Sequence, residues 1–139
     1  MSLYKNFGTN KEAETKGVSI EFGVNDDKSV IAFIVSRSGK SNKKYVKALE
    51  AATKPYRRQI QLGTMDDELS NKIYMDVWIS TVLKGWENVQ DETGKALAFN
   101  KTNATKLFTD LPELYEELQS KSNDFTTFQD ESREDDAKN

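Results

Sequence analysis

Two different hydrophobic patterns divide the chain. Apolar and polar residues alternate over residues 18–22, residues 30–35 are apolar throughout, and a polar turn rich in glycine, asparagine and aspartate lies between the two runs. Two β-branched and aromatic runs around such a turn predict an antiparallel β-hairpin. Because the second run has no polar face, we expect it to be buried on both sides.

Beyond the hairpin, apolar residues recur at helical spacing and predict a series of helices. Serine and asparagine side chains can cap the first turn of a helix, and proline is tolerated at the first helical position. Such start signals occur at Ser41 or Asn42, Pro55, Asn100 and Pro112. The first helix should reach about Thr53, and the second should end at Gly63, because glycine readily adopts the left-handed conformation that closes a helix.

The segment from Leu69 to Lys84 predicts a longer helix with an unusually apolar surface. Thr64 and the acidic residues that follow it provide a start signal for this helix. When the residues are placed about 100° apart, apolar side chains nearly encircle the helix and leave only a thin polar strip. Such a helix is either central in its own domain or completed by a partner, because exposed apolar patches usually mark interfaces.

Together these elements predict an α+β fold, a mostly helical bundle of about four to five helices with an N-terminal β-hairpin. Residues 17–129 should form a single globular domain, since the length of the chain suits one hydrophobic core. The first 16 residues lack sustained periodicity, and we expect them to form a mobile arm. Residues 130–139 are mostly charged, and we expect them to form an acidic tail.

Charge is distributed unevenly along the chain. Residues 1–109 contain 17 Lys and Arg against 13 Asp and Glu, a net charge of +4. Residues 110–139 contain 3 against 10, a net charge of −7. The body of the chain is therefore mildly basic and its end strongly acidic, so the two parts could attract each other or serve different partners.

The composition argues against an enzyme. The chain contains no cysteine and no histidine, which removes thiolate nucleophiles, most zinc sites and the general base most used near neutral pH. The adjacent aspartate pairs have structural explanations in a turn, a helix start and the tail, so we expect no metal site and no cofactor. No segment approaches the ~20 apolar residues of a membrane span, and none resembles a signal peptide, so we expect no membrane partner and a cytoplasmic location.

Basic residues gather around the first predicted helix, where they could contact phosphates while Tyr45 and Tyr56 contact bases. They are Lys40, Lys43, Lys44, Lys47, Lys54, Arg57 and Arg58. On a helix, however, Tyr45 shares the apolar side with Leu49, so the lysines fit a solvated face. The sequence pI of about 5.1 is also unusual for a general nucleic-acid binder. A nucleic-acid-binding regulator that uses the Lys40–Arg58 cluster is therefore an alternative to the main hypothesis.

Several sequence segments, taken in their order along the chain, resemble small tail assembly chaperones of long-tailed phages or prophages. The resemblance covers roughly residues 4–139. Its segments are residues 7–18 (FGTNKEAETKGV), 37–45 (RSGKSNKKY), 54–58 (KPYRR) and 86–89 (WENV) with Gly94, and residues 99–104 (FNKTNA) with Leu111 and Pro112.

This resemblance implies a viral protein that works in the cytoplasm of the bacterial host and is absent from the mature virion. It would bind the tape measure protein, keep that long helical client soluble, and help to recruit subunits of the tail tube protein. Genes of this kind often produce a longer form by ribosomal frameshifting. A structural tail or connector protein of the virion remains a further alternative.

Partner binding is expected on the apolar surface of the long helix and on the last predicted helix. The residues assigned to it are Tyr74, Trp78, Val82, Leu114 and Tyr115. Aromatic side chains are common hot spots of protein interfaces, although core packing explains Trp78 better than partner binding does. Two further questions stay open, namely whether the acidic tail takes part in binding and whether the chain forms a homo-oligomer.

Overall fold

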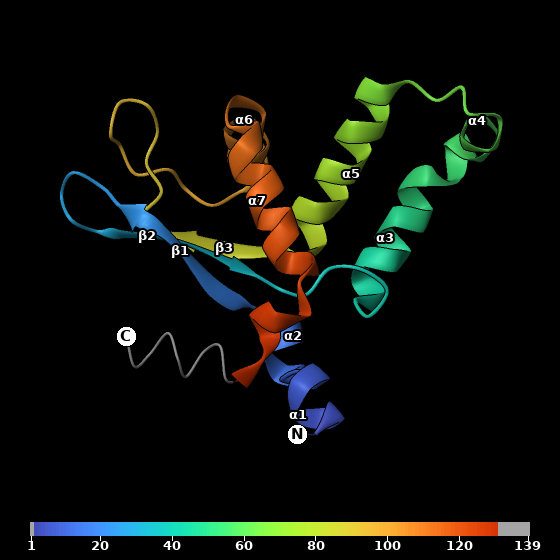
Figure 1. Ribbon diagram of the computed structural model, residues 1–139. Coiled ribbons are helices and arrows are strands. Elements are labelled where there is room, and N and C mark those ends of the chain that lie inside the picture. The colour runs from blue at the N-terminus through green and yellow to red at the C-terminus, as the bar shows by residue number, and fades with distance from the viewer. Residues whose placement is uncertain (1, 131–139) are drawn as a thin grey trace.

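Three antiparallel strands and seven α-helices make up the part of the chain that the computed structural model describes, residues 2–130 (Figure 1). In chain order the elements are α1 (Leu3–Phe7), α2 (Lys11–Lys16), β1 (Val18–Val24), β2 (Val30–Val35), α3 (Lys43–Thr53), the 3₁₀ helix η1 (Lys54–Tyr56), α4 (Arg57–Leu62), α5 (Asp67–Thr81), β3 (Leu83–Glu87), α6 (Lys101–Asp110), α7 (Pro112–Asn123) and the 3₁₀ helix η2 (Phe125–Phe128). The predicted α+β class is therefore correct.

The two predicted strands are present and pair in antiparallel fashion, with Ile20 opposite Phe33. They do not stand alone as a hairpin, because β3 pairs with the other side of β2 and places Trp86 opposite Phe33. Ile20, Phe33 and Trp86 consequently form one row across the sheet. Cross-strand rows of large apolar side chains are a main source of sheet stability.

The third strand corrects the prediction for the long helix, which ends at Thr81 rather than near Lys84. A short apolar run such as Val82–Leu83 looks the same at the end of a helix and at the start of a strand, so the helical pattern hides the change of structure. The start of α5 also differs from the prediction. Asp66, not Thr64, caps the helix, with its carboxylate accepting a hydrogen bond from the Leu69 backbone N–H at 3.2 Å.

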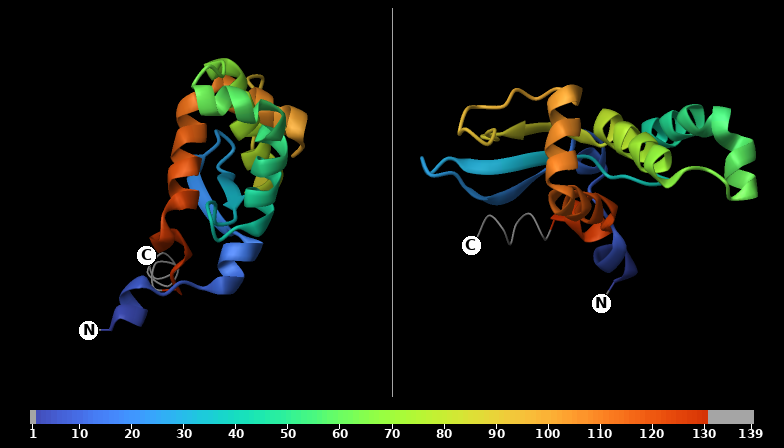
Figure 2. Two further views of the ribbon diagram at one scale, coloured as in Figure 1. Left: turned by 90° about the vertical axis from the view of Figure 1, so that its right-hand side faces the viewer. Right: turned by 90° about the horizontal axis from the view of Figure 1, so that it is seen from above.

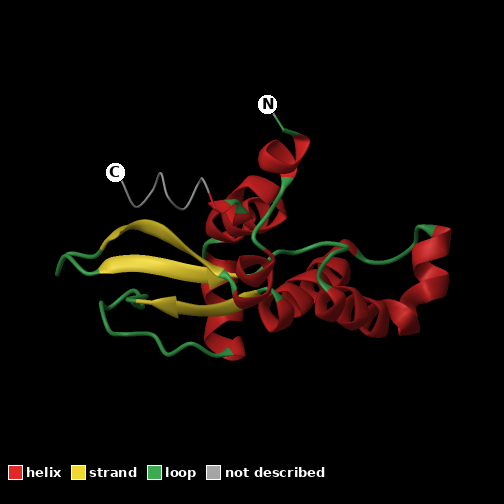
Figure 3. Ribbon diagram, turned by 90° about the horizontal axis from the view of Figure 1, so that it is seen from below, coloured by secondary structure: helices red, strands yellow, loops and turns green. Residues whose placement is uncertain are grey.

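The predicted bundle of four to five helices is wrong. Figure 2 shows, in its view from above, that α6 and α7 stand between the sheet on one side and a helical arm of α3, α4 and α5 on the other. The view from below gives the same arrangement (Figure 3). Because α5 runs almost directly into β3, α6 and α7 pack where the arm meets the sheet, and the helices share no common bundle core.

Aromatic rings link the sheet to these helices. The Phe108 ring on α6 lies 6.3 Å from the ring of Phe33 in β2 and 5.9 Å from that of Trp78 in α5, measured between centroids. The Tyr115 ring on α7 lies 5.5 Å from both Trp78 and Phe108. These rings join the sheet to helices α5, α6 and α7, and they lie in the hydrophobic core.

A buried serine completes the core by satisfying polar groups from three segments. The Trp78 indole N–H donates to Ser122 Oγ at 3.2 Å, and the Ser122 hydroxyl donates to the Gln119 carbonyl at 2.9 Å. The backbone N–H of Ser38 donates to the Ser122 carbonyl at 3.0 Å. The end of α7 is therefore tied both to α5 and to the loop that follows β2.

The first residues of the chain contain α1 and α2, which lie beside η2. Asn10 caps α2, the Phe7 and Phe125 rings stack with centroids 5.7 Å apart, and Arg37 pairs with Glu14 at 3.0 Å. Most of the predicted acidic tail, residues 131–139, lies outside the described residues. Within residues 2–130, no helix is both long and apolar enough to cross a membrane.

Candidate partner-binding surface

An open groove crosses the surface where α5, α6 and α7 meet, and we call it the Tyr74 groove. It has a volume of about 470 Å³ and is lined by Asn71, Tyr74, Met75, Phe108, Pro112, Tyr115, Glu116 and Gln119. The buried Phe108 lies at its apolar base, while polar side chains from α5 and α7 stand along its sides. An apolar base with a polar rim is the usual anatomy of a protein interface.

Tyr74 links this groove to a second hollow. Its side chain is 44% exposed on α5 and also lines a smaller hollow of about 200 Å³ between α4 and α5, together with Ile60 and Met65. Ile60 and Leu62 on α4 are 47% and 66% exposed. Exposed apolar side chains therefore lie on α4 as well as at the Tyr74 groove, and Tyr74 belongs to both hollows.

The structure brings two of the five predicted binding residues together. Tyr74 and Tyr115 line the Tyr74 groove from opposite helices, and Leu114 packs against the core without lining the groove. Trp78 and Val82 are buried inside the core. Trp78 packs beneath the groove against Phe108 and Tyr115, and neither buried side chain forms part of the surface.

Sequence reasoning missed the contribution of α4. Ile60 and Leu62 stand in a short helix between basic residues and a closing glycine, and the predicted helix boundaries do not indicate their exposure. A helix of six residues is too short to bury two large apolar side chains by itself. This imbalance is the signal that could have identified them.

Burial is the larger of two causes that raise the pKa of Tyr115 to about 12, and the neighbouring Tyr45 hydroxyl is the smaller one. The pKa in the unfolded chain is about 10. The unfolded state therefore loses this proton first, and folding stability should be complete below pH 10 and fall as the pH rises toward 12.

We expect this alkaline loss of stability to be smaller in a Tyr115→Phe variant, which has no hydroxyl at this position to titrate. Urea unfolding of the natural chain and of the variant between pH 9 and 11.5 measures the difference. All other tyrosines and lysines are common to both proteins and cancel in the comparison. Equal pH dependence in the two proteins would contradict the assignment.

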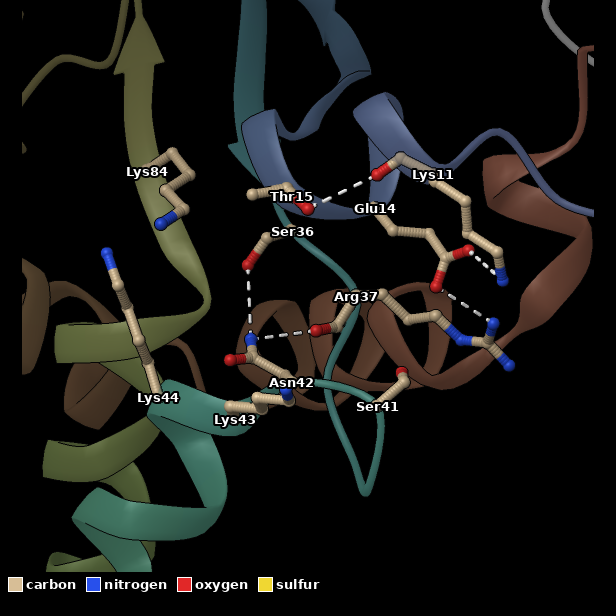
Figure 4. Close-up of a pocket in the computed structure, with 10 residues that line it drawn as sticks. All are labelled: Lys11, Glu14, Thr15, Ser36, Arg37, Ser41, Asn42, Lys43, Lys44 and Lys84. Atoms are coloured by element: carbon tan, nitrogen blue, oxygen red, sulfur yellow. Dashed lines mark hydrogen bonds and ion pairs between the residues drawn. The ribbon is translucent and has the colours of Figure 1, made fainter.

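The basic residues of the alternative hypothesis are all exposed on α3, α4 and the segments beside them. Lys43 and Lys44 line a separate basic cleft with Arg37 and with cations from α2 and β3 (Figure 4). The other basic residues of the cluster do not line this cleft. The seven residues therefore do not form one contiguous site.

Comparison with known proteins adds a family assignment. The sequence model of the YdaY prophage protein family matches residues 40–139, a span of 100 of the 139 residues. No curated protein and no solved structure matches the chain. The matched span runs from the loop before α3 to residue 139, so it contains every residue of the Tyr74 groove. The chain therefore belongs to the YdaY prophage protein family.

Proposed function

We propose that this prophage protein is a tail assembly chaperone that binds the tape measure protein through the Tyr74 groove. In this role it keeps the long helical client soluble, helps to recruit tail tube subunits, and leaves before the virion is complete. The proposed role is one of binding and needs no catalytic chemistry.

The observation that carries this proposal is that two hollows share the exposed Tyr74, with the exposed Ile60 lining one of them and Tyr115 the other. An amphipathic client helix places apolar side chains at positions i, i+3, i+4 and i+7, and a groove between helices is a common receptor for such a stripe. The Tyr74 groove offers aromatic rings with polar edges, which contribute large contact areas to interfaces. The order of the sequence segments that resemble tail assembly chaperones, together with the membership of a prophage family, supports the choice of client.

Co-expression with the tape measure protein of the same prophage tests the proposal. We expect the client to become soluble and to co-purify with the chain. An unrelated helical protein of similar length, expressed in the same way, should gain no solubility. The proposal fails if the tape measure protein stays insoluble and no complex is recovered.

Mass spectrometry of purified virions separates a chaperone from a structural tail or connector protein. A chaperone should be missing from the particles while it is abundant in the infected cells. Stoichiometric recovery of the chain in virions would instead support a structural role.

A further inference from the structure

The basic cleft lies apart from the Tyr74 groove, between α2, the segment that follows β2, the start of α3, and β3. Its volume is about 390 Å³. Five of its lining residues are basic and one is acidic, namely Lys11, Arg37, Lys43, Lys44, Lys84 and Glu14. The cleft therefore carries an excess of positive charge.

Glu14 is occupied by two of these cations. Its carboxylate lies 3.0 Å from Arg37 Nη1 and 3.3 Å from Lys11 Nζ. Burial alone would raise the pKa of Glu14, but hydrogen bonds from Thr9, Arg37 and Lys11 outweigh burial and hold this pKa below its ordinary value. Glu14 consequently stays ionised, and its single negative charge is shared between Arg37 and Lys11.

The other three cations of the cleft have no carboxylate partner among the described residues. Among residues 2–130, no carboxylate lies within ion-pair distance of Lys43, Lys44 or Lys84. Figure 4 shows Lys44 on α3 and Lys84 on β3 pointing toward one another. Two ammonium groups that converge on one space repel each other unless an anion lies between them.

The N-terminus of α3 adds to the positive potential of the cleft. Lys43 and Lys44 occupy the first turn of α3, which contains no acidic residue. The first turn of a helix carries partial positive charge and favours anions, so lysines at this position are unfavourable on their own. The ammonium groups and the helix end together would stabilise a bound carboxylate.

We propose that the chain's own acidic end, residues 131–139, binds in the basic cleft. This segment contains Glu131, Glu134, Asp135 and Asp136 against two basic residues. The described chain ends close by, because the Asn10 side chain donates to the Asp130 carboxylate at 2.7 Å and Lys11, the next residue, lines the cleft. Nine residues can extend about 30 Å from that point.

Tethering favours this occupant over a free anionic partner. A segment joined to the same chain by a short linker competes at an effective concentration on the order of millimolar. The acidic segment would also repel the phosphates of a nucleic acid that approached the cleft. The proposal is independent of the proposed chaperone function, because it concerns a different face of the protein.

The experiment uses the full chain, which has no cysteine of its own. A nitroxide spin label is attached through an Asn139→Cys substitution, and the amide signals of Ser36, Asn42 and Lys43 are followed by NMR. At about 0.01 M salt, where the Debye length is about 30 Å, we expect these signals to lose more than half of their intensity. At about 1 M salt the Debye length is only about 3 Å, and the intensity should return.

Two charge-matched variants locate the contact. Lys44→Ser with Lys84→Ser removes two cations of the cleft and should restore the signals at low salt. Lys47→Ser with Lys54→Ser removes the same charge from exposed positions outside the cleft and should leave the broadening unchanged. Equal effects of the two variants would show unspecific attraction and overturn the proposal.

Three other outcomes also overturn it. The first is full signal intensity at low salt in the natural background. The second is broadening that arises when the spin label is carried only by a second, isotopically unlabelled copy, because the contact would then be between chains. The third is perturbation of the same amides by a short single-stranded oligonucleotide while the spin-labelled end leaves them unchanged, because the cleft would then serve nucleic acid.

Discussion

Replacing Phe108 by alanine should lower the free energy of unfolding by about 3–5 kcal/mol, the usual range for removing a large buried aromatic side chain. Phe108 is fully buried and its ring contacts those of Phe33, Trp78 and Tyr115. The substitution would remove the ring that joins the sheet to α5 and α7 and would leave a cavity between layers that cannot easily close. Urea unfolding followed by tryptophan fluorescence measures the loss.

Phe99→Ala is the matched control for this substitution. The Phe99 side chain is 41% exposed and meets the Trp86 ring edge to face, with ring centroids 5.0 Å apart. Removal of this ring should lower the free energy of unfolding much less, because water already reaches it in the folded protein. If the two variants were equally destabilised, the core would not be centred on Phe108 as described.

Tyr74→Ala should weaken binding of the tape measure protein by about 2 kcal/mol, or roughly 30-fold in Kd, which is the scale of an interface hot spot. Tyr74 is the residue shared by the Tyr74 groove and the hollow next to α4. Its loss would therefore remove the one side chain that lines both hollows. Titration of the purified chain with a soluble fragment of the client measures the affinity.

Tyr4→Ala provides the comparison, since Tyr4 is 91% exposed on α1, far along the chain from the groove. This variant should bind the client as the natural chain does. Circular dichroism of both variants checks that the fold is retained. Unchanged affinity of a folded Tyr74→Ala variant would remove the Tyr74 groove from the proposed interface.

Local signals in the sequence were enough to locate several helix ends. Asn42 and Asn100 each accept a hydrogen bond from a backbone N–H in the first turn of their helices, at 3.0 and 2.8 Å, as predicted. Pro112 opens α7, and Gly63 closes α4 in the left-handed conformation. These features depend on a few neighbouring residues, so they can be recognised without knowledge of the fold.

The arrangement of the elements depends on distant contacts and could not be recognised in this way. Val82 and Leu83 continue an apolar helical pattern, yet the first leaves the helix and the second begins β3. What decides their structure is pairing with β2, where Val35 lies opposite Leu83. Without that strand pair the sequence suggests one long helix and, from it, a bundle.

The same limit applies to the candidate site. A helical wheel identifies Tyr74, Trp78 and Val82 as apolar but does not indicate which of them faces a neighbour. Phe108 and Tyr115 cover Trp78, whereas nothing covers Tyr74 completely among the described residues. Whether an apolar residue belongs to the groove or to the core therefore depends on how the helices pack, which the helical wheel does not show.

The position of β3 in the sheet sets an order of folding. Residues 36–82, a stretch of 47, separate β2 from β3, whereas only five residues separate β1 from β2. With the usual dependence on loop length, closing the longer connection costs about 2 kcal/mol more in chain entropy. We therefore expect β1 and β2 to pair early and β3 to join last, after the arm has formed. Until then one edge of β2 has unpaired backbone groups, and a chain with a weakened arm would expose that edge to aggregation.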